Sequence, residues 1–274
     1  MITQQRTQDA WDDIAAGYDE FVTPTHLSLA ERALRLAGLR PGMHFLDVAA
    51  GTGALSITAA RLGARVLATD ISAAMVERLS ARAREGGLSN LEGRVMDGHA
   101  LDLGSDTFDI SGSQFGVMLF PNLSLGLSEL VRVTKAGGKV LIVAYGPPTK
   151  VEFLSFFLRA MRAAVPGFTG IPMDPPPLPF QVADPAKLRQ KMADAGLHDI
   201  GVETVSEKLK FQSAKQMWDW VTHSHPIGAG LVADLTAEQG AMVRQALDDM
   251  LRERSGGSGH AILSNPTHIA TGTK

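Results

Sequence analysis

The chain has 274 residues, of which 45% are hydrophobic and 20% charged, a balance typical of globular proteins and not of disordered ones. Its 26 basic and 29 acidic residues give a net charge of −3, which argues against a large basic surface for binding nucleic acid. The absence of cysteine excludes disulfides, zinc–thiolate sites and cysteine nucleophiles. The polar start, residues 1–6, lacks the apolar core of a signal peptide, and no run of 18 apolar residues predicts a membrane span. We therefore expect a cytoplasmic protein.

The first half of the chain alternates between predicted strands and predicted helices. Two amphipathic helices are expected first, over residues 7–21 and 27–38. Short apolar strands and helices then follow one another, joined by glycine turns: strands at 43–48, 65–70, 91–96, 108–113 and 139–144, and helices at 54–62, 73–85 and 123–133. This alternation predicts an α/β fold with a Rossmann-like, mostly parallel sheet covered by helices on both faces.

The alternation breaks twice in the second half. Residues 147–183 combine a helix rich in Phe and Met (152–165) with a proline-rich stretch that can continue neither a helix nor a central strand. A helix at 185–196 and strands near 200–205 and 260–271 resume the pattern and bring the sheet to seven strands. We therefore predict a core over 1–146, 184–212 and 256–274, with a mainly helical lid built from two insertions, 147–183 and 213–255.

A glycine-bearing turn follows the first predicted strand. Gly51 and Gly53 would let the backbone approach a ligand closely, and Ala49 in the same turn is also small. Asp70 lies at the end of the next strand, 17 residues after Gly53, where a carboxylate suits the two hydroxyls of a ribose. A purely structural explanation exists for each. The glycines would allow close packing of the helix on the strand, and Asp70 would cap the N-terminus of the following helix.

The charge pattern around this turn separates two kinds of cofactor. A dinucleotide enzyme prefers a third glycine, where this chain has Ser56, and the fixed carboxylate of Asp47 would repel a diphosphate. S-adenosylmethionine carries a sulfonium and an amino group and has no phosphate, so the pattern favours it. Asp97, followed by Gly98, ends the third strand and can accept a hydrogen bond from an adenine amino group. Apolar contact with the base is expected from Ile71 and Met75.

These residues resemble the class I S-adenosylmethionine-dependent methyltransferases, and within them the branch similar to the ubiquinone/menaquinone C-methyltransferases. The resemblance covers roughly residues 9–146 and rests on six segments: AAGYD at 15–19, LDVAAGTG at 46–53, ATDIS at 68–72, SQFGVM at 113–118, ELVRV at 129–133 and GGK at 137–139. Ala49 departs from the glycine that many of the class have. The resemblance implies that Asp47, Gly51 and Gly53 line the methionine part of the cofactor. It also implies that Asp70 holds the ribose, that Asp97 holds the adenine, and that Tyr18 closes over the cofactor.

Other candidate residues are less specific. Tyr18 also belongs to a helical stripe with Trp11 that is typical of a core, and Gln114 follows the fourth strand, near where the methyl group should point. His223 and His225 lie seven or fewer residues from Trp218 and Trp220 and are candidates for a general base, because histidine titrates near neutral pH. His26 and His99 are further candidates of the same kind. No spacing of histidines and carboxylates predicts a metal site.

The expected function is methyl transfer from S-adenosylmethionine to a small, fairly apolar molecule that binds in a dry pocket under the lid. The methylated atom, whether oxygen, nitrogen or carbon, and the oligomeric state are left open, with a homodimer among the alternatives. A nicotinamide-dependent oxidoreductase and a non-catalytic S-adenosylmethionine-binding protein are the competing interpretations. The lack of an obvious base keeps the second of these open.

Overall fold

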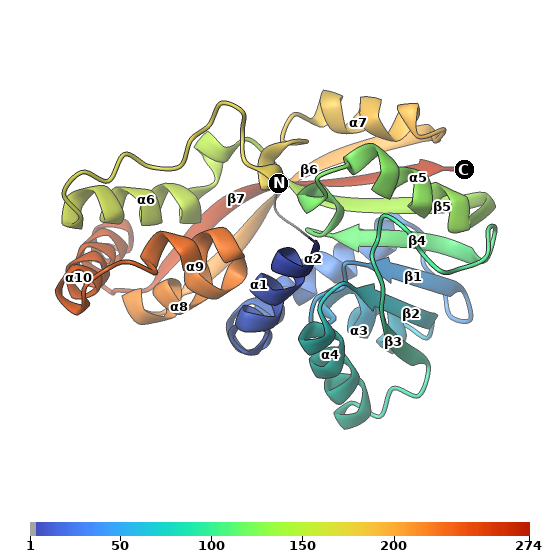
Figure 1. Ribbon diagram of the computed structural model, residues 1–274, viewed down its shortest axis with the longest axis horizontal. Helices are drawn as coiled ribbons and strands as arrows, with labels where there is room; N and C mark the ends of the chain where they lie inside the picture. Colours follow the sequence, from blue (N-terminus) through green and yellow to red (C-terminus); the bar gives the residue numbers. More distant parts are fainter. Residues whose placement is uncertain (1–3) are drawn as a thin grey trace.

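The computed structural model describes residues 4–274 and contains one central sheet with helices on both faces (Figure 1). The first three residues of the polar start lie outside the described residues. Seven strands form the sheet in the order β3–β2–β1–β4–β5–β7–β6. They are β1 (His44–Val48), β2 (Arg65–Asp70), β3 (Leu91–Val95), β4 (Phe108–Gln114), β5 (Thr134–Tyr145), β6 (His198–Phe211) and β7 (Ala261–Thr273).

The strand directions confirm the predicted mostly parallel α/β fold. Strands β1 to β5 pair in parallel, whereas β7 runs antiparallel to both β5 and β6. The order reverses at β1, which has β2 on one side and β4 on the other. Ligands of open α/β sheets bind outside the carboxyl ends of the strands at such a reversal. The topology therefore places a site beyond the ends of β1, β2 and β4.

Helices cover the two faces of the sheet as the chain alternates between strand and crossover (Figure 1). On one face, α3 (Ala54–Arg61) packs between α2 (Thr23–Leu36) and α4 (Ala73–Glu85). On the other face, α5 (Leu123–Val133) packs against α7 (Pro185–Asp194). Each predicted helix is present within a few residues of its expected bounds, apart from those at the N-terminus.

The N-terminal helices differ from the prediction. The sequence pattern predicts two separate helices, whereas the chain stays helical from α1 (Gln4–Gly17) through a π-helical segment, η1 (Tyr18–Val22), into α2. π-helical turns are rare overall, but a large share of them occur at functional sites. This one begins at Tyr18. Together α1 and η1 pack on α4 and on α8 (Ala214–Ser224). The N-terminal helices therefore join the sheet to the C-terminal helices.

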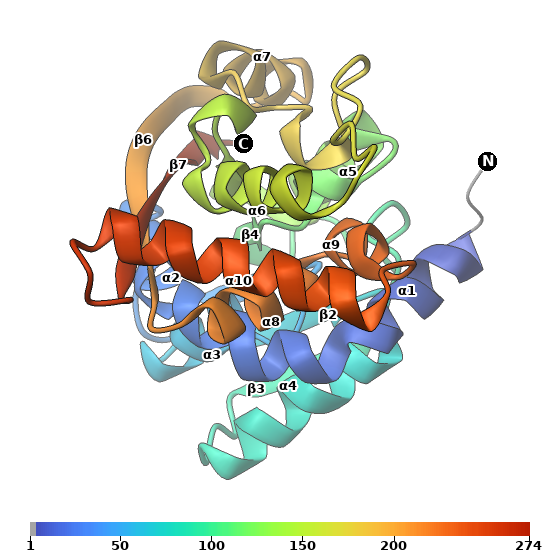
Figure 2. The same cartoon turned by 90° about the vertical axis from the view of Figure 1, so that its left-hand side faces the viewer.

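The last two strands run past the rest of the sheet. β5 pairs with β7 from Lys139 to Tyr145, while β6 and β7 stay paired out to Phe211 and Ala261. The expected strand at 200–205 is therefore too short. Four helices pack around this two-stranded ribbon and are called the helical cluster below (Figures 1 and 2): α6 (Glu152–Ala164), α8, α9 (Pro226–Val232) and α10 (Ala237–Arg254). The division into core and lid segments stays a prediction.

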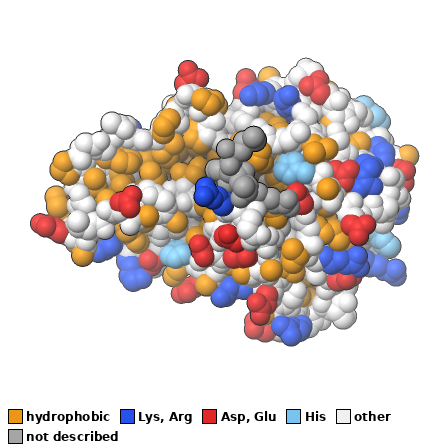
Figure 3. All heavy atoms as spheres, in the orientation of Figure 1, with side chains coloured by type: hydrophobic (Ala, Val, Ile, Leu, Met, Phe, Trp, Pro, Cys, Tyr) orange, Lys and Arg blue, Asp and Glu red, His pale blue; other side chains and the backbone are white. Residues whose placement is uncertain are grey.

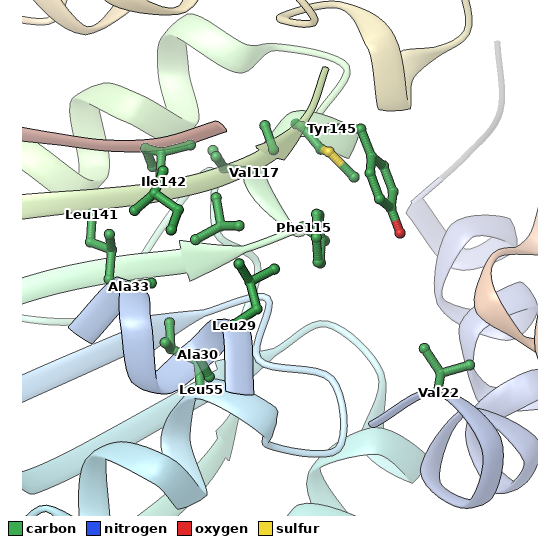
Figure 4. Packing of buried hydrophobic residues seen from close by; sticks show 14 of the residues in the cluster. Val22, Leu29, Ala30, Ala33, Leu55, Phe115, Val117, Leu141, Ile142 and Tyr145 are labelled. Atoms are coloured by element: carbon green, nitrogen blue, oxygen red, sulfur yellow. The ribbon is translucent and has the colours of Figure 1, made fainter. Parts of the chain in front are cut away.

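One hydrophobic core runs from the sheet into the helical cluster. Leu29 and Ala33 of α2 lie beside Leu141 and Ile142 of β5, and Phe115 lies beside Tyr145 toward the helical cluster (Figure 4). The same core contains residues of the helical cluster that are fully buried: Phe157, Trp220, Val243, Leu247 and Leu251. Burying one such side chain contributes about 1.5–3 kcal/mol. The cluster therefore shares its stabilising burial with the sheet.

Within residues 4–274, no helix has the length and apolar character that a membrane crossing requires. The same residues contain no grouping of three or more His, Asp or Glu side chains placed to hold a metal ion.

Candidate functional site

The turn after β1 approaches the end of β2 through its backbone. Ala49 and Gly51 both have a φ of 55°, a left-handed conformation that glycine adopts readily and alanine rarely. The Gly51 N–H donates a hydrogen bond of 2.8 Å to Oδ2 of Asp70. The glycine turn and the acid at the end of the next strand are therefore joined directly by a hydrogen bond.

Asp70 is fixed at the wall of a cavity. Its Oδ1 accepts a 2.9 Å hydrogen bond from the Ser72 N–H, so both carboxylate oxygens are held by backbone donors. The side chain of Ser72, and not that of Asp70, caps α4, because its Oγ accepts from the Met75 N–H. Burial raises the pKa of Asp70 above its usual range. Each oxygen keeps a lone pair with which to accept a ligand hydroxyl.

Asp47 lies deeper, beneath the turn. It is 1% exposed, its Oδ2 accepts a hydrogen bond from the Ser56 hydroxyl, and its Oδ1 has no partner among residues 4–274. Burial, with a further contribution from the charge of Asp70, raises the pKa of Asp47 to about 7. Ser56, which replaces the third glycine of a dinucleotide motif, thus has a role of its own as a donor to this carboxylate.

Asp97 follows β3 at the far side of the same cavity. Its Oδ1 accepts hydrogen bonds of 2.9 Å from both the backbone N–H and Nδ1 of His99. The His99 ring in turn packs on Phe120, with 4.5 Å between the ring centroids. Gly98 lies against the same phenylalanine, and a Cβ there would be 2.4 Å from Cζ of Phe120. Only glycine fits at this point of the wall.

These side chains enclose a cavity of about 260 Å³, called the larger cavity below. Nine of the predicted cofactor residues line it: Tyr18, Ala49, Gly51, Asp70, Ile71, Met75, Asp97, Gly98 and Gln114. The other two, Asp47 and Gly53, lie outside its lining. Gly53 begins α3 and faces Leu79 and Ile57, so its contacts are those of helix packing.

Gln114 presents an unused acceptor at this cavity. Its Nε2 donates a 3.2 Å hydrogen bond to the carbonyl of His26, while its Oε1 is buried without a partner among the described residues. A buried acceptor without a donor is costly, so this atom is suited to a donor supplied by a ligand. Within residues 4–274, no Lys or Arg lines the larger cavity. Its walls carry two carboxylates and no positive counter-charge for a phosphate.

A second cavity of about 100 Å³, called the smaller cavity below, adjoins the larger one under the helical cluster. Trp11, Tyr18, Phe115 and Leu119 line both cavities. The rest of the smaller cavity is largely aromatic and aliphatic, with Tyr145, Phe153, Phe157 and Phe180 among its walls. On the face shown in Figure 3, hydrophobic side chains gather between α6 and α9, beside this cavity. Tyr18, whose pKa is raised chiefly by burial, stands at the junction as a neutral phenol.

The two histidines predicted as bases are placed differently. His225 lines the smaller cavity, where burial lowers its pKa to about 4, and its Nδ1 accepts a 2.9 Å hydrogen bond from the Ile227 N–H. That bond begins α9 and occupies the only lone pair of the neutral ring. His223 lines neither cavity, because its Nδ1 lies 2.7 Å from the Asp219 carbonyl and its ring packs on Phe21. Neither position supports the predicted role of a base.

Two further polar residues belong to this region: His26, which the sequence offered only as one more candidate base, and Glu207, which sequence reasoning missed. His26 lines the smaller cavity, and Glu207 lies behind it with Nε2 of His26 3.9 Å from its Oε1. A signal for Glu207 is present in the chain, because it takes a buried position in the alternation of Val205, Leu209 and Phe211 along β6. A carboxylate on the apolar face of a strand is unusual, because acidic side chains are rarely buried unless they are paired.

The N-terminal part of the chain is similar to a known protein family. The model of the ubiE/COQ5 methyltransferase family matches residues 1–168. An uncharacterized protein of Mycobacterium tuberculosis is 33% identical over 177 residues, which are 65% of this chain and 61% of that protein. This chain therefore matches less than two thirds of that relative's length. The demethylmenaquinone methyltransferase of Renibacterium salmoninarum is 30% identical over 212 residues, 73% of this chain and 86% of the relative.

The fold is also found among solved structures. A phosphoethanolamine N-methyltransferase of Haemonchus contortus, solved with phosphomonomethylethanolamine and S-adenosylhomocysteine, superposes with a TM-score of 0.56 at 16% identity. The superposition covers 90% of this chain and 52% of that one. At this identity the likeness extends to the fold alone.

Proposed function

The chain belongs to the ubiE/COQ5 methyltransferase family, whose members depend on S-adenosylmethionine, and from that premise we propose that it transfers a methyl group from this cofactor to a small, apolar molecule. The observation that carries the proposal is the pairing of the two cavities. The larger one has carboxylates at the ends of successive strands, and the smaller one, which adjoins it, is apolar. The proposal assigns the cofactor to the first and the methyl acceptor to the second.

The residues of the larger cavity fit an adenosyl nucleoside that bears positive charge. Asp70 would accept from the ribose hydroxyls and Asp97 from the adenine amino group, with Ile71 and Met75 against the base. The free Oε1 of Gln114 would accept from the amino group of the methionine part. Asp47 lies beneath the turn and does not line the cavity, and above its pKa of about 7 its ionised form would add negative charge there. When bound, S-adenosylmethionine supplies an electrophilic methyl carbon on a sulfonium.

The smaller cavity supplies position and dryness. Its aromatic walls exclude water, and removing water from a cation and a nucleophile favours a reaction in which charge is lost. Holding two reactants in line contributes roughly 7–11 kcal/mol in well-oriented cases. Trp11, Tyr18, Phe115 and Leu119, which line both cavities, would set the direction from which the acceptor meets the methyl group. Lid closure by the helical cluster, the cytoplasmic location and a homodimer remain predictions.

The nicotinamide oxidoreductase is disfavoured by the same geometry. A pyrophosphate would meet Asp70 and the buried Asp47 with no Lys or Arg among the described lining residues to offset them. A protein that binds the cofactor without turnover shares the larger cavity with the proposed enzyme. That alternative does not explain why an apolar cavity adjoins the one assigned to the cofactor.

Two measurements on the full chain test the proposal. Isothermal titration calorimetry should show binding of S-adenosylmethionine and S-adenosylhomocysteine and no binding of NAD. Cofactor carrying a labelled methyl group, incubated with a panel of small aromatic and aliphatic acceptors, should then give a labelled product. Binding of NAD alone would overturn the proposal, and tight cofactor binding without a labelled product from any acceptor would favour the non-catalytic alternative.

A further inference from the structure

Glu207 is a buried carboxylate without a hydrogen bond. It is 7% exposed on β6, and neither of its oxygens has a partner among residues 4–274. Leaving a buried acid unpaired costs the full free energy of its desolvation, so natural cores rarely keep one without a use for it. Its neighbours on the same face of β6, Val205 and Leu209, are apolar, so fold stability gives no reason for an acid here.

His26 lies between this carboxylate and the smaller cavity. The imidazole is 3% exposed, its Nε2 lies 3.9 Å from Oε1 of Glu207, and this nitrogen also lacks a hydrogen-bond partner among the described residues. The ring packs between Phe115 and Trp220, with centroid separations of 4.9 and 6.1 Å. His26 lines the smaller cavity, whereas Glu207 does not. A carboxylate behind an imidazole fixes which ring nitrogen carries the proton and steadies the imidazolium that forms.

We propose that His26, oriented by Glu207, is the base that removes a proton from the hydroxyl group of a phenol-class acceptor bound in the smaller cavity. This inference rests on the proposed function and identifies its base and the class of its acceptor. His26 is the catalytic residue, because it faces the acceptor, and Glu207 is a positioning residue that acts through it. His225, the other histidine of this cavity, has its Nδ1 lone pair committed to Ile227.

The chemistry of the smaller cavity selects the acceptor class. Tyr145, Phe153 and Phe180 give it aromatic walls, and within the described residues no Lys, Arg, Asp or Glu lines it. A charged acceptor would lose its hydration there without gaining a partner. A single aromatic ring suits a cavity of about 100 Å³, and its hydroxyl needs a base because an apolar site disfavours spontaneous ionisation.

The proton and electron balance needs no further reagent. The acceptor O–H bond breaks, its proton passes to Nδ1 of His26, and the Nε2–H of the same ring donates to the Glu207 carboxylate. The acceptor oxygen forms a bond to the methyl carbon as the carbon–sulfur bond breaks, and the electron pair of that bond stays on sulfur as a neutral thioether. The proton on the pair then returns to solvent, and the products are a methyl ether and S-adenosylhomocysteine.

The pair should work at mildly alkaline pH. Burial raises the pKa of Glu207 to about 8 and lowers that of His26 to about 4. Among the described residues, the other titratable groups of this cavity are Tyr18, Tyr145 and His225. Burial raises the pKa of both tyrosines and lowers the pKa of His225 to about 4, so all three stay neutral at the pH of the assay. Below the pKa of Glu207 its carboxyl is protonated and neutral, so it no longer stabilises the imidazolium that forms when His26 takes the acceptor's proton. The rate of methyl transfer to a neutral phenol should therefore rise with pH and level off above about 8.

The decisive experiment compares acceptors that need a base with one that does not. Phenol is neutral at the assay pH, whereas 4-nitrophenol is largely ionised in mildly alkaline buffer. The ionised acceptor should bind this apolar cavity weakly, so the rates are compared as kcat at saturating acceptor, where weak binding does not enter. General-base catalysis contributes roughly 10²–10⁴-fold, so His26→Gln and Glu207→Gln should each lower kcat for phenol on the order of 100-fold and kcat for 4-nitrophenol only slightly. Glu203→Gln, on the same strand with its side chain 43% exposed beside Arg32, is the matched control and should change neither rate.

A second readout needs no turnover. In the protein without cofactor, nitrogen NMR of labelled histidine should show a His26 ring signal that shifts in Glu207→Gln and is unchanged in Glu203→Gln. Calorimetry should give both site variants wild-type affinity for S-adenosylmethionine, which separates this inference from the proposed function. The proposed role of His26 and Glu207 would be refuted if the two variants lost rate equally for phenol and 4-nitrophenol. It would also be refuted if Glu207→Gln left the His26 ring signal unchanged. Cofactor binding by the wild-type chain without methylation of any phenol would overturn the acceptor class while leaving methyl transfer standing.

Discussion

Asp70 holds the glycine turn as well as a wall of the larger cavity. Its oxygens accept from the N–H groups of Gly51 and Ser72, so the side chain that would meet the ribose also fixes the backbone around it. Asp70→Ala therefore removes a ligand contact and also leaves two backbone donors without their partner.

We expect Asp70→Ala to lower the affinity for S-adenosylmethionine about 100-fold or more, since two charge-assisted hydrogen bonds of roughly 1.5–3 kcal/mol each are lost. Stability should fall by about 1–3 kcal/mol for the stranded N–H groups. Calorimetry and urea denaturation measure the two effects. Asp102→Ala, which removes an exposed carboxylate beyond β3, is the control. Wild-type affinity in Asp70→Ala would contradict the ribose role.

A substitution at Gly98 would change the shape of the larger cavity without changing its charge. A Cβ at this position would lie 2.4 Å from Cζ of Phe120 and 2.8 Å from Cγ1 of Val48, so Gly98→Ala must displace one of them. We expect at least about tenfold weaker cofactor binding, because overpacking costs about 1–3 kcal/mol and here deforms the adenine side of the cavity. Gly104→Ala, whose Cβ would meet only Thr107 Oγ1 at 3.3 Å, should bind as the wild type does. Equal affinities for the two variants would show that the wall does not touch the cofactor.

Among the elements, β6 contains a residue whose proposed chemical role conflicts with stability. The ionised form of Glu207 that the chemistry uses also destabilises the folded protein. Folding raises the pKa of Glu207 from 4.5 to about 8, so between these values the folded protein holds a proton that the unfolded chain releases. The free energy of unfolding therefore falls as pH rises through this window. Each pKa unit corresponds to about 1.4 kcal/mol, so the loss amounts to several kcal/mol.

Glu207→Gln removes that titration and should abolish the loss. Its Tm should match the wild type near pH 5, where Glu207 is protonated, and should exceed it by a margin that grows up to about pH 8. Thermal unfolding followed by circular dichroism at several pH values measures the margin. Glu203→Gln should give no such trend, because this acid is partly exposed and pairs with Arg32 on the surface. A margin that shrinks with pH would mean that Glu207 is ionised and compensated in the folded state.

Local sequence signals predicted the elements near the cofactor better than those near the acceptor. Alternating apolar strands and glycine turns identified the parallel sheet. The glycine turn, the acids and other residues at strand ends, and the family resemblance together identified nine residues that line the larger cavity. These signals are local, because each acid follows its own strand. The smaller cavity brings together α2, β5, α6 and α9, and no spacing along the chain encodes that meeting. The π-helical segment at Tyr18 and the length of β6 likewise depend on tertiary packing.

At the scale of the whole molecule, the helical cluster and the sheet share one core. Phe157 of α6 is fully buried in it, while its neighbour Phe156 is partly exposed. Phe157→Ala should cost about 3–5 kcal/mol and shift a single unfolding transition, because the cluster cannot unfold without exposing the core. Phe156→Ala should cost much less. Two separate transitions in the calorimetric scan of Phe157→Ala would show that the cluster is an independent unit.

A crystal structure of the wild-type protein with S-adenosylhomocysteine would show whether the larger cavity binds the cofactor. We expect the ribose at Asp70, the adenine beside Asp97 and Gly98, and the sulfur directed toward the smaller cavity. A larger cavity that stays vacant at saturating ligand, or the nucleoside bound elsewhere on the molecule, would refute the assignment of the cofactor to this cavity.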